Sequence, residues 1–349
     1  MKKKIIAIIV AIVLIIPLSR GWYEFLLDYF FDAELASSTQ LKFEKISDTE
    51  VEVVGYDSDY GSNLSIPVKV LIGLHIYKVT SIGEKSFLYC NKKKIKIPDG
   101  VTNIGEQAFF GCKLTSIEIP KGVTNIKNRT FSDCKNMTSI TLPEGIKVIG
   151  IGAFSGCEKL TSINLPAGMT KIGIGAFINC KELENIELPN SVTDIGRDAF
   201  YGCDYLRSIE IPDGVTNIND NVFENCYHLG SVKIPDGVNR IGVSAFRNCH
   251  SLTIINIPNE VERIGENAFV ECNSLTKVVL SNSLTSINYR TFSGCSSLES
   301  IVIPEDVTSI GVGAFKGCKK LNVLIDNSKE KVEIGKDAFE GCISVRFLK

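Results

Sequence analysis

The sequence predicts one elongated solenoid, a stack of β-rich coils with a parallel sheet along one face. Two observations carry this prediction. The pattern Phe-x-x-Cys occurs twelve times between Phe87 and Cys342. Successive cysteines of the pattern lie 22, 22, eight times 23 and finally 24 residues apart. A fixed period of about 20 to 30 residues is typical of a solenoid, because each unit is too small to bury its apolar face alone and is stabilised by its neighbours.

Each period contains one main β-strand, for which residues 206–211 are representative. Ile209 and Ile211 point to one face of such a strand, and Ser208 and Glu210 point to the other, because side chains alternate along a strand. We expect the isoleucines in the core and the polar pair in solvent. The main strands of successive coils then form a parallel sheet with one exposed face.

A turn and a second short strand follow the main strand. Pro212, Asp213 and Gly214 predict the turn, because proline fixes φ at its second position and glycine is favoured at its fourth. The motif Val-Thr-x-Ile after the turn predicts the second strand. The chain therefore changes direction at each turn and begins another side of the coil.

The position after Val-Thr-x-Ile is the most restricted position of the repeat. Glycine and asparagine, which occupy it in all coils but one, accept positive φ most readily, so we expect a left-handed residue there. The twelve residues at this position are Gly83, Gly105, Lys127, Gly150, Gly173, Gly196, Asn219, Gly242, Gly265, Asn288, Gly311 and Gly335.

The segment between this position and the cysteine predicts a short helical turn, whose inner face Phe and Cys share because they are three residues apart. In-register residues of adjacent coils have parallel Cβ atoms about 4.8 Å apart. A disulfide instead requires Cβ atoms about 3.8 Å apart and turned toward each other. We therefore expect the twelve cysteines to be reduced, buried thiols that act as small hydrophobic groups.

The complete repeat, Val-Thr-x-Ile-Gly-x-x-Ala-Phe-x-x-Cys-x-x-Leu-x-x-Ile-x-Ile-Pro, closely resembles the BspA-like leucine-rich repeat family. The resemblance covers residues 79–349 and implies a leucine-rich repeat solenoid of about twelve repeats of 22–24 residues. Residues 41–78 resemble the N-terminal capping hairpin and opening coil of that family, with the hairpin over 41–46 and 51–56. The family is found on surface proteins of host-associated bacteria and in some protists, and it is associated with adhesion to host matrix proteins or to other cells.

Residues 1–20 predict an export signal or an uncleaved signal anchor. Three lysines at positions 2–4 precede an apolar run over residues 5–16, the usual order of an export signal. No small-x-small cleavage site follows, and the run is short for a membrane span of about 17 or more residues. The aromatic residues of segment 21–40 suit a juxtamembrane linker. We favour an anchor with the repeats outside the cell, and a cleaved signal would secrete the same repeats.

Charge and residue content argue against several functional classes. The chain has 38 basic and 40 acidic residues, a net charge of −2 and no basic stripe interleaved with aromatic residues, so we expect no nucleic-acid partner. The three histidines do not lie at ligand spacing from cysteines, so we expect no metal site and no cofactor. No Gly-x-Ser-x-Gly motif is present, and the near-constant period leaves no insertion for a catalytic cluster. We expect a non-enzymatic protein.

The exposed positions of the main strands change character along the predicted column. The first two thirds are small, polar and partly acidic, and include Glu187 and Glu210. Val279, Val302 and Ile325 predict an apolar stripe near the C-terminal end, and irregular packing of the last coils is the alternative explanation. Contiguous exposed apolar area usually marks an interaction surface. We therefore take these five residues as candidate partner-binding residues.

These features together predict a cell-surface protein that mediates protein–protein or cell adhesion through its exposed strand face. The expected partner is a protein or a cell-surface macromolecule, and the resemblance places host matrix among the partner classes. The N-terminal segment supplies the expected membrane contact. The alternative is a structural spacer, an envelope-associated scaffold without a specific ligand.

Overall fold

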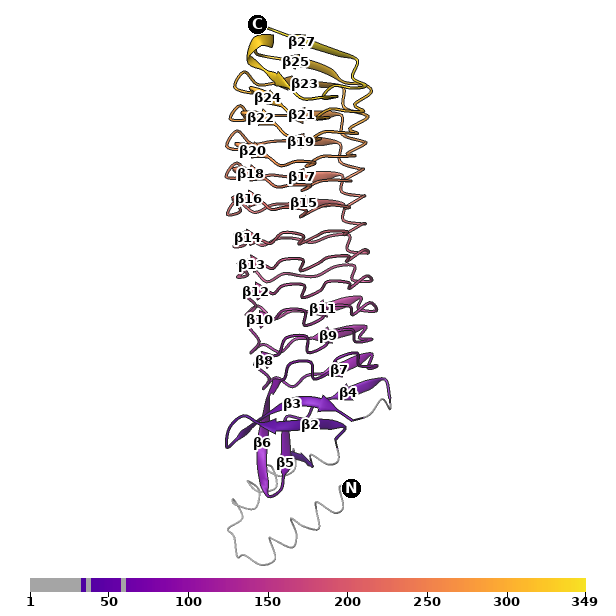
Figure 1. Cartoon of the computed structure of the whole chain (residues 1–349). Helices are drawn as coiled ribbons and strands as arrows, with labels where there is room; N and C mark the ends of the chain where they lie inside the picture. The colour runs from indigo at the N-terminus through magenta and orange to yellow at the C-terminus, as the bar shows by residue number, and fades with distance from the viewer. Residues whose placement is uncertain (1–32, 36–38, 58–60) are drawn as a thin grey trace, which may run out of the picture.

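The computed structural model describes residues 33–35, 39–57 and 61–349, and it confirms the predicted solenoid. Figure 1 shows an elongated column in which one coil lies above the next, with the C-terminus at the end opposite the hairpin of β2 (Leu41–Lys45) and β3 (Glu50–Tyr56). Strands of successive coils pair in parallel along the column. The expected export signal, residues 1–20, lies outside the described residues, as does most of the expected linker, residues 21–40.

The main strands form one side of the column, as the alternation of apolar and polar residues predicts. The central residue of each three-residue strand points inward, and its two neighbours lie at the surface. On this side two middle coils are linked by an isolated bridge between Ser162 and Asn185. The main strands are β7 (Lys94–Lys96), β9 (Ser116–Glu118), β11 (Ser139–Thr141), β15 (Ser208–Glu210), β17 (Ser231–Lys233), β19 (Ile254–Asn256), β21 (Lys277–Val279), β23 (Ser300–Ile303), β25 (Asn322–Ile325) and β27 (Ser344–Phe347).

A second set of strands, each two residues long, forms another side of the column. These strands come from the Val-Thr-x-Ile motifs, and their isoleucines are buried in all coils but the last. They are β8 (Asn103–Ile104), β10 (Asn125–Ile126), β12 (Val148–Ile149), β13 (Lys171–Ile172), β14 (Asp194–Ile195), β16 (Asn217–Ile218), β18 (Arg240–Ile241), β20 (Arg263–Ile264), β22 (Ser286–Ile287), β24 (Ser309–Ile310) and β26 (Glu333–Ile334).

The N-terminal end of the column is covered by a sheet of different topology, in the order β1-β5-β6-β3-β2. Strand β2 pairs antiparallel with β3, β3 pairs parallel with β6, and β6 continues into the solenoid by pairing with β8. The opening strand β4 pairs with β7 of the main sheet. These strands are β1 (Ala33–Leu35), β2 (Leu41–Lys45), β3 (Glu50–Tyr56), β4 (Asn63–Ser65), β5 (Lys69–Ile72) and β6 (His75–Ile82).

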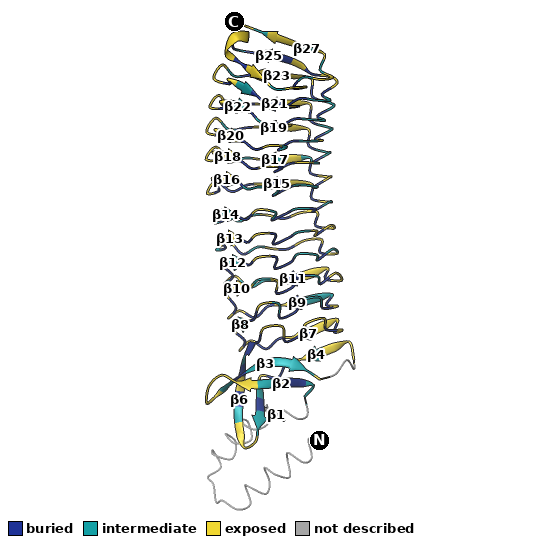
Figure 2. Cartoon of the chain, viewed as in Figure 1, coloured by how far each residue is buried: buried dark blue, intermediate teal, exposed yellow. Residues whose placement is uncertain are grey.

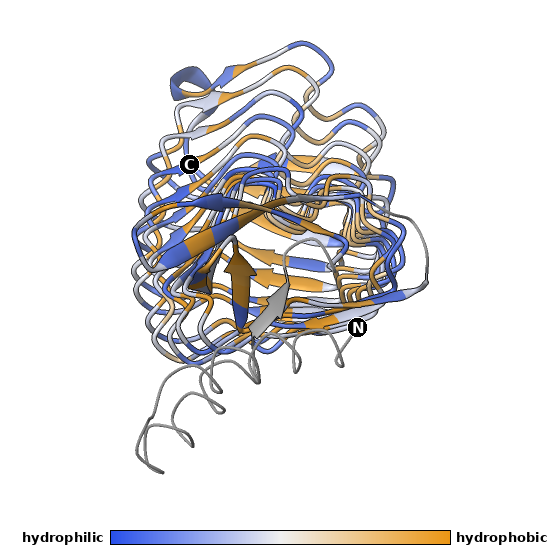
Figure 3. Ribbon diagram, turned by 90° about the horizontal axis from the view of Figure 1, so that it is seen from below, coloured by the Kyte–Doolittle hydropathy of each residue, from blue (hydrophilic) through white to orange (hydrophobic). Residues whose placement is uncertain are grey.

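A continuous stack of phenylalanine rings runs through the core from Phe87 to Phe339. Ring centroids of successive coils lie 5.2–5.7 Å apart, and the rings are nearly parallel. Offset stacking at this distance is favourable for aromatic rings. Figure 3, which looks along the column, shows the coils superposed around this common interior, and Figure 2 shows buried residues inside and exposed residues at the turns.

The twelve cysteines are free thiols, and eleven of them are buried. Each thiol from Cys112 onward donates to the carbonyl oxygen of the phenylalanine in the preceding coil, with Sγ···O distances of 2.9–3.5 Å. In a middle coil, the Sγ of Cys203 lies 3.2 Å from the oxygen of Phe177. The repeat therefore selects cysteine as a small apolar group that also links adjacent coils.

The expected left-handed conformation after Val-Thr-x-Ile is wrong. None of the nine glycines at this position has a positive φ. A Cβ built on Gly173 would lie 2.6 Å from the carbonyl carbon of Gly150 and 2.7 Å from the nitrogen of Ile151. In the glycine coils the backbones of adjacent coils therefore approach too closely for a Cβ without a shift, and this close approach favours glycine. The positive φ values occur two and six residues later, as at Gly175 and Asn179.

The expected short helical turn is also wrong, because the segment before each cysteine is a series of tight turns. The described residues contain one 3-10 helix, η2 (Lys329–Lys331), near the C-terminal end. In the turn segments, every second N–H group donates to the carbonyl oxygen of the residue three positions earlier in the same coil. The other N–H groups donate to carbonyls of the next coil: Asp198 to Asp220, Phe200 to Val222 and Gly202 to Glu224. We call each such set of three forward-directed N–H groups the turn row of its coil.

Candidate interaction surface

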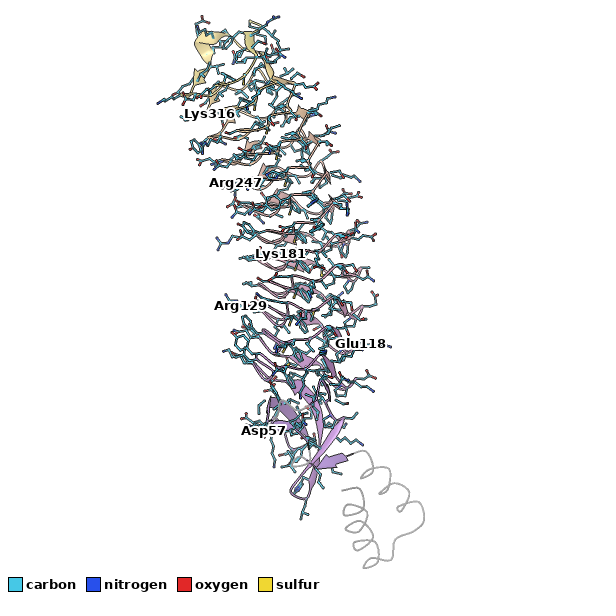
Figure 4. All side chains as sticks on the ribbon, turned by 90° about the vertical axis from the view of Figure 1, so that its right-hand side faces the viewer. Asp57, Glu118, Arg129, Lys181, Arg247 and Lys316 are labelled. Carbon is cyan, nitrogen blue, oxygen red and sulfur yellow. The ribbon has the colours of Figure 1, made fainter. Side chains whose placement is uncertain are left out.

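The exposed residues of the main strands form one surface, which we call the strand face. It has two columns, one from the first and one from the third residue of each strand. Figure 4 shows side chains projecting along the whole column, with Glu118 of β9 among the labelled ones. The third-residue column is Lys96, Glu118, Thr141, Asn164, Glu187, Glu210, Lys233, Asn256, Val279, Val302, Leu324 and Arg346.

An apolar stripe lies on the strand face near its C-terminal end. Val279 is 46% exposed and Val302 is 54% exposed. Lys277 pairs with Ser300 across β21 and β23, so the two valines, each two residues further along its strand, lie side by side. Val302 pairs in turn with Leu324 of β25, which is half-buried. These three residues form the stripe.

Ile325 does not belong to the stripe, because its side chain is completely buried. In the coil that contains Ile325, the segment between the cysteine and the main strand is one residue shorter than the same segment of the preceding coil. Ile325 therefore pairs with the buried Ile303, 22 residues earlier, and Leu324 takes the exposed position. A shift of one residue moves every side chain of a strand to the opposite face. The sequence-based assignment of Ile325 as a partner-binding residue is accordingly corrected to Leu324.

Val279 and Val302 line a hollow of about 600 Å³ on the strand face. Glu305, Asp306, Asp326 and Lys277 line the same hollow. Lys349 lies 2.5 Å from Glu305 and 3.1 Å from Asp326, so two of the three carboxylates are paired. The hollow therefore combines exposed valines with a mixture of acidic and basic side chains, and an apolar side chain with polar neighbours is the chemistry that fits such a surface.

Glu187 and Glu210 lie together in a second hollow of about 680 Å³, several coils away from the stripe. Lys233 lines this hollow too and pairs with Glu210. The carboxylate of Glu210 raises the pKa of Lys233, so the lysine stays charged. The structure thus places the two candidate glutamates close to each other and the two candidate valines close to each other. Strands β17 and β19 lie between the pair of glutamates and the pair of valines.

Ion pairs connect adjacent coils outside the strand face. The carboxylate of Glu158 lies 3.3 Å from Lys135 and 3.2 Å from Lys181, so it bridges three coils, and these lysines lower the pKa of Glu158. Lys316 lies 2.8 Å from Glu340 in the same manner. Figure 4 labels Lys181 and Lys316 on the surface of the column. Exposed pairs of this kind contribute little to stability, so we assign them no functional role.

Two further apolar residues of the strand face, one exposed and one half-buried, were not among the sequence-based candidates. Ile254, in the first-residue column, is 50% exposed, and Leu324 occupies the position that Ile325 was expected to hold. The alternation within β19 marks Ile254 as exposed, whereas only the length of the coil reveals Leu324. Among residues 39–57 and 61–349, no group of three or more His, Cys, Asp or Glu side chains is placed to hold a metal ion. In that part of the chain no helix is long and apolar enough to cross a bilayer.

Comparison with known proteins gives a family match over most of the column. The family model described as "BspA type Leucine rich repeat region (6 copies)" matches residues 75–183, 170–299 and 216–346. These overlapping matches cover the column from β6 to β27. No curated protein matches the chain.

Solved structures with the same architecture come from several bacteria. A leucine-rich repeat protein from Bacteroides ovatus is 32% identical, with a TM-score of 0.70, and the match covers 87% of this chain and 91% of that one. A leucine rich cell surface protein from Faecalibacterium prausnitzii is 28% identical, with a TM-score of 0.61 over 89% of this chain and 93% of that one. The pneumococcal vaccine antigen PcpA, at 22% identity and a TM-score of 0.63 over 88% of this chain and 85% of that one, shares the fold.

Proposed function

Because this chain belongs to the BspA-type leucine-rich repeat family, we propose that it is an exported, non-enzymatic protein that binds another protein through its strand face at the cell surface. The observation that carries the proposal is the apolar stripe. Val279 and Val302 are about half exposed, side by side, on a face whose other positions are mostly polar. Exposed contiguous apolar area of this kind usually marks an interaction surface.

The chemistry of the first hollow supports a protein partner. Covering apolar surface contributes about 25 cal/mol per Å² removed from water, so an apolar side chain seated on the valines would stabilise the complex. Glu305, Asp306, Asp326 and Lys277 line the same hollow, and Lys349 pairs with Glu305 and Asp326. An apolar centre with polar and charged residues around it is the usual anatomy of a protein–protein interface. We therefore propose a partner that presents an apolar residue with polar neighbours.

A surface location is supported by two observations. The similar protein from Faecalibacterium prausnitzii is described as a cell surface protein. The lysines at positions 2–4 and the apolar run over residues 5–16 have the order of an export signal. We propose that this segment exports the chain and anchors it with the repeats outside the cell. Adhesion to host matrix would follow from the resemblance to the family.

A structural spacer is the second candidate, and the polar part of the strand face favours it. From β9 to β17 the exposed positions are serine, threonine, asparagine and charged residues. The stacked core extends without interruption over the same coils. A spacer would need this stiffness and would need no specific ligand.

Binding of bacteria that display the full chain to immobilised host extracellular matrix proteins tests the proposal. The variant Val279→Ser/Val302→Ser removes the two most exposed residues of the stripe, and Val243→Ser/Val312→Ser removes two valines that are 38% and 45% exposed elsewhere on the column. We expect the first variant to lose binding at equal display, and the second to retain it. Equal binding by both variants would reject the stripe as the site. Absence of binding by the unaltered chain would favour the spacer.

A further inference from the structure

The first two cysteines of the column, Cys90 and Cys112, contact each other directly. The thiol of Cys90 donates to the Sγ of Cys112, and the two sulfur atoms lie 2.8 Å apart. Both side chains are buried. A disulfide bond is about 2.0 Å long, so the two sulfurs need to approach by only about 0.8 Å to become linked.

The thiol of Cys90 is turned differently from the thiols further along the column. Each thiol from Cys112 onward donates to the carbonyl oxygen of a phenylalanine in the preceding coil, as Cys157 does to Phe131 at 3.2 Å. These side chains therefore turn toward the preceding coil. The thiol of Cys90 turns toward the following coil, because it donates to Cys112. Cys90 and Cys112 consequently face each other, as a disulfide requires and as the parallel side chains of in-register residues otherwise do not.

The backbone on both sides of this contact holds the first two coils together. The N–H of Phe87 donates to the carbonyl oxygen of Ala108 at 2.8 Å, and the N–H of Lys113 donates to that of Cys90 at 2.9 Å. The rings of Phe87 and Phe109 stack with centroids 5.3 Å apart. These contacts keep the two thiols close to each other, and proximity of this kind favours a bond within the chain over a bond between two chains.

We propose that Cys90 and Cys112 form a disulfide when the chain folds in the presence of a low-molecular-weight disulfide. The thiolate of one cysteine attacks a sulfur of this oxidant, which gives a mixed disulfide and releases one small thiol. The thiolate of the other cysteine then attacks the protein sulfur of the mixed disulfide, forms the bond between Cys90 and Cys112 and releases the second small thiol. The protein loses two electrons and two protons, and the two released thiols carry them.

Burial decides when this exchange takes place. Burial raises the pKa of Cys112, and the neighbouring thiol of Cys90 adds to the effect. A thiol in such surroundings is seldom ionised, whereas the thiolate is the form that attacks a disulfide. We therefore expect the bond to form while the first coils are folding or are open locally, and only slowly in the closed column.

The loop that this disulfide closes contains the junction between the N-terminal sheet and the repeats. Strands β7 and β8 lie within residues 90–112, and they pair with β4 and β6 respectively. A disulfide restricts the unfolded chain over the loop that it closes and so stabilises the folded state. The inference does not rest on the proposed binding function, because it involves only buried side chains.

Refolding of the full chain in mild detergent with a mixture of reduced and oxidised glutathione, followed by alkylation in urea and digestion with trypsin, tests the proposal. Trypsin places the two cysteines in separate peptides, residues 86–92 and 97–113. We expect these peptides to be linked, with a mass two hydrogens below their sum, and ten of the twelve cysteines to be alkylated, because the bond consumes two. The linked chain should also unfold at a higher urea concentration than the same chain in reductant.

Two variants distinguish this bond from general oxidation of the thiols. Cys112→Ala removes one partner, so it should abolish both the linked peptides and the rise in the urea midpoint. Cys157→Ala, at the same position two coils later, should keep both. The proposal is overturned if all twelve cysteines of the unaltered chain are alkylated, or if other cysteines are linked while peptides 86–92 and 97–113 are not. The peptide analysis of the unaltered chain decides the proposal even where Cys112→Ala fails to fold.

Discussion

The side-chain amide of Asn219 donates to the carbonyl oxygen of Ile195 at an N···O distance of 2.7 Å, and so replaces a backbone hydrogen bond of the glycine coils. In those coils the N–H of the glycine donates to the preceding coil, as Gly173 does to Ile149 at 2.8 Å. Asn288 repeats the side-chain bond to Ile264 at 2.5 Å. Asparagine is therefore compatible with this position because of its amide, and not because of a left-handed backbone.

The first prediction concerns the close approach of coils at Gly173. Gly173→Ala should lower the free energy of unfolding by about 1–3 kcal/mol, because the new Cβ meets the backbone of Gly150. Gly173→Asn should cost less than Gly173→Ala, because the amide can bond to Ile149 as Asn219 bonds to Ile195. The comparison is matched, because the coils before and after Gly173 have glycine at this position and so do the coils before and after Asn219.

Urea denaturation of the two variants measures the difference. Gly237→Ala is the matched control, because the nearest atom to a Cβ there is the carbonyl oxygen of Asp213 at 3.6 Å, an ordinary contact. We expect that control to change the unfolding free energy by less than about 1 kcal/mol in either direction. An equal loss in Gly173→Ala and Gly237→Ala would show that close approach does not select glycine.

The second prediction distinguishes the two faces of the last strands. Ile325→Ala should lower the free energy of unfolding by about 2–5 kcal/mol, because Ile325 is completely buried and the change leaves a cavity. Val302→Ala should change it by no more than about 0.5 kcal/mol, because Val302 is 54% exposed. Thermal and urea melts of both variants provide the comparison. A larger loss in Val302→Ala than in Ile325→Ala would reverse the assignment of the faces.

The sequence predicts the fold because the period is a property of the whole stack, whereas it predicts individual positions less well. The Phe-x-x-Cys spacing identifies twelve coils, and alternation assigns the faces of β15 correctly. Alternation assigns Ile325 to the wrong face, because its coil is one residue shorter and the register of the strand shifts by one residue, although the strand still contains the expected apolar residues. At Gly173 the sequence restricts the side chain but cannot show whether conformation or a neighbouring backbone imposes the restriction.

The candidate site is predicted in part for similar reasons. Val279 and Val302 are adjacent because the repeat keeps a constant length there. Residues one repeat apart in the sequence then lie beside each other in neighbouring coils. The charged residues beside the valines, Glu305, Asp306 and Asp326, could not be predicted, because their position depends on how the turn after each strand folds back beside the next coil.

The third prediction concerns the reactivity of the thiols. Cys342 is half-buried in the last coil, whereas the other eleven cysteines are buried. Under native conditions a small alkylating reagent should modify Cys342 first and the others only after unfolding, because reaction requires an accessible thiolate. Burial raises the pKa of Cys342 to about 12, so even this reaction should accelerate as the pH rises. Mass spectrometry of partially alkylated protein locates the modified residue, and early modification of Cys203 would contradict the packing of the core.

The fourth prediction follows from the raised pKa values of the buried thiols. Burial raises the pKa of Cys157, Cys203 and Cys249 well above the ordinary value, with the neighbouring thiols adding to the effect. In the unfolded chain a cysteine ionises at a pKa of about 8.5. Below that pH both states hold the proton, so the thiols leave stability unchanged. Above it the unfolded state loses protons that the folded state retains, and the stability falls as the pH rises.

Urea denaturation between pH 7 and pH 9.5, under anaerobic conditions with reductant, measures this dependence. We expect a free energy of unfolding that is nearly constant below about pH 8 and falls progressively above it, with each thiol approaching about 1.4 kcal/mol per pH unit once it is ionised in the unfolded chain. The variant Cys203→Ala should be less stable at pH 7 because it loses packing and the bond to Phe177, but its stability should fall less steeply with pH. A stability that stays constant up to pH 9.5 would mean that the thiols ionise as readily in the folded column as in the unfolded chain, which their burial does not allow.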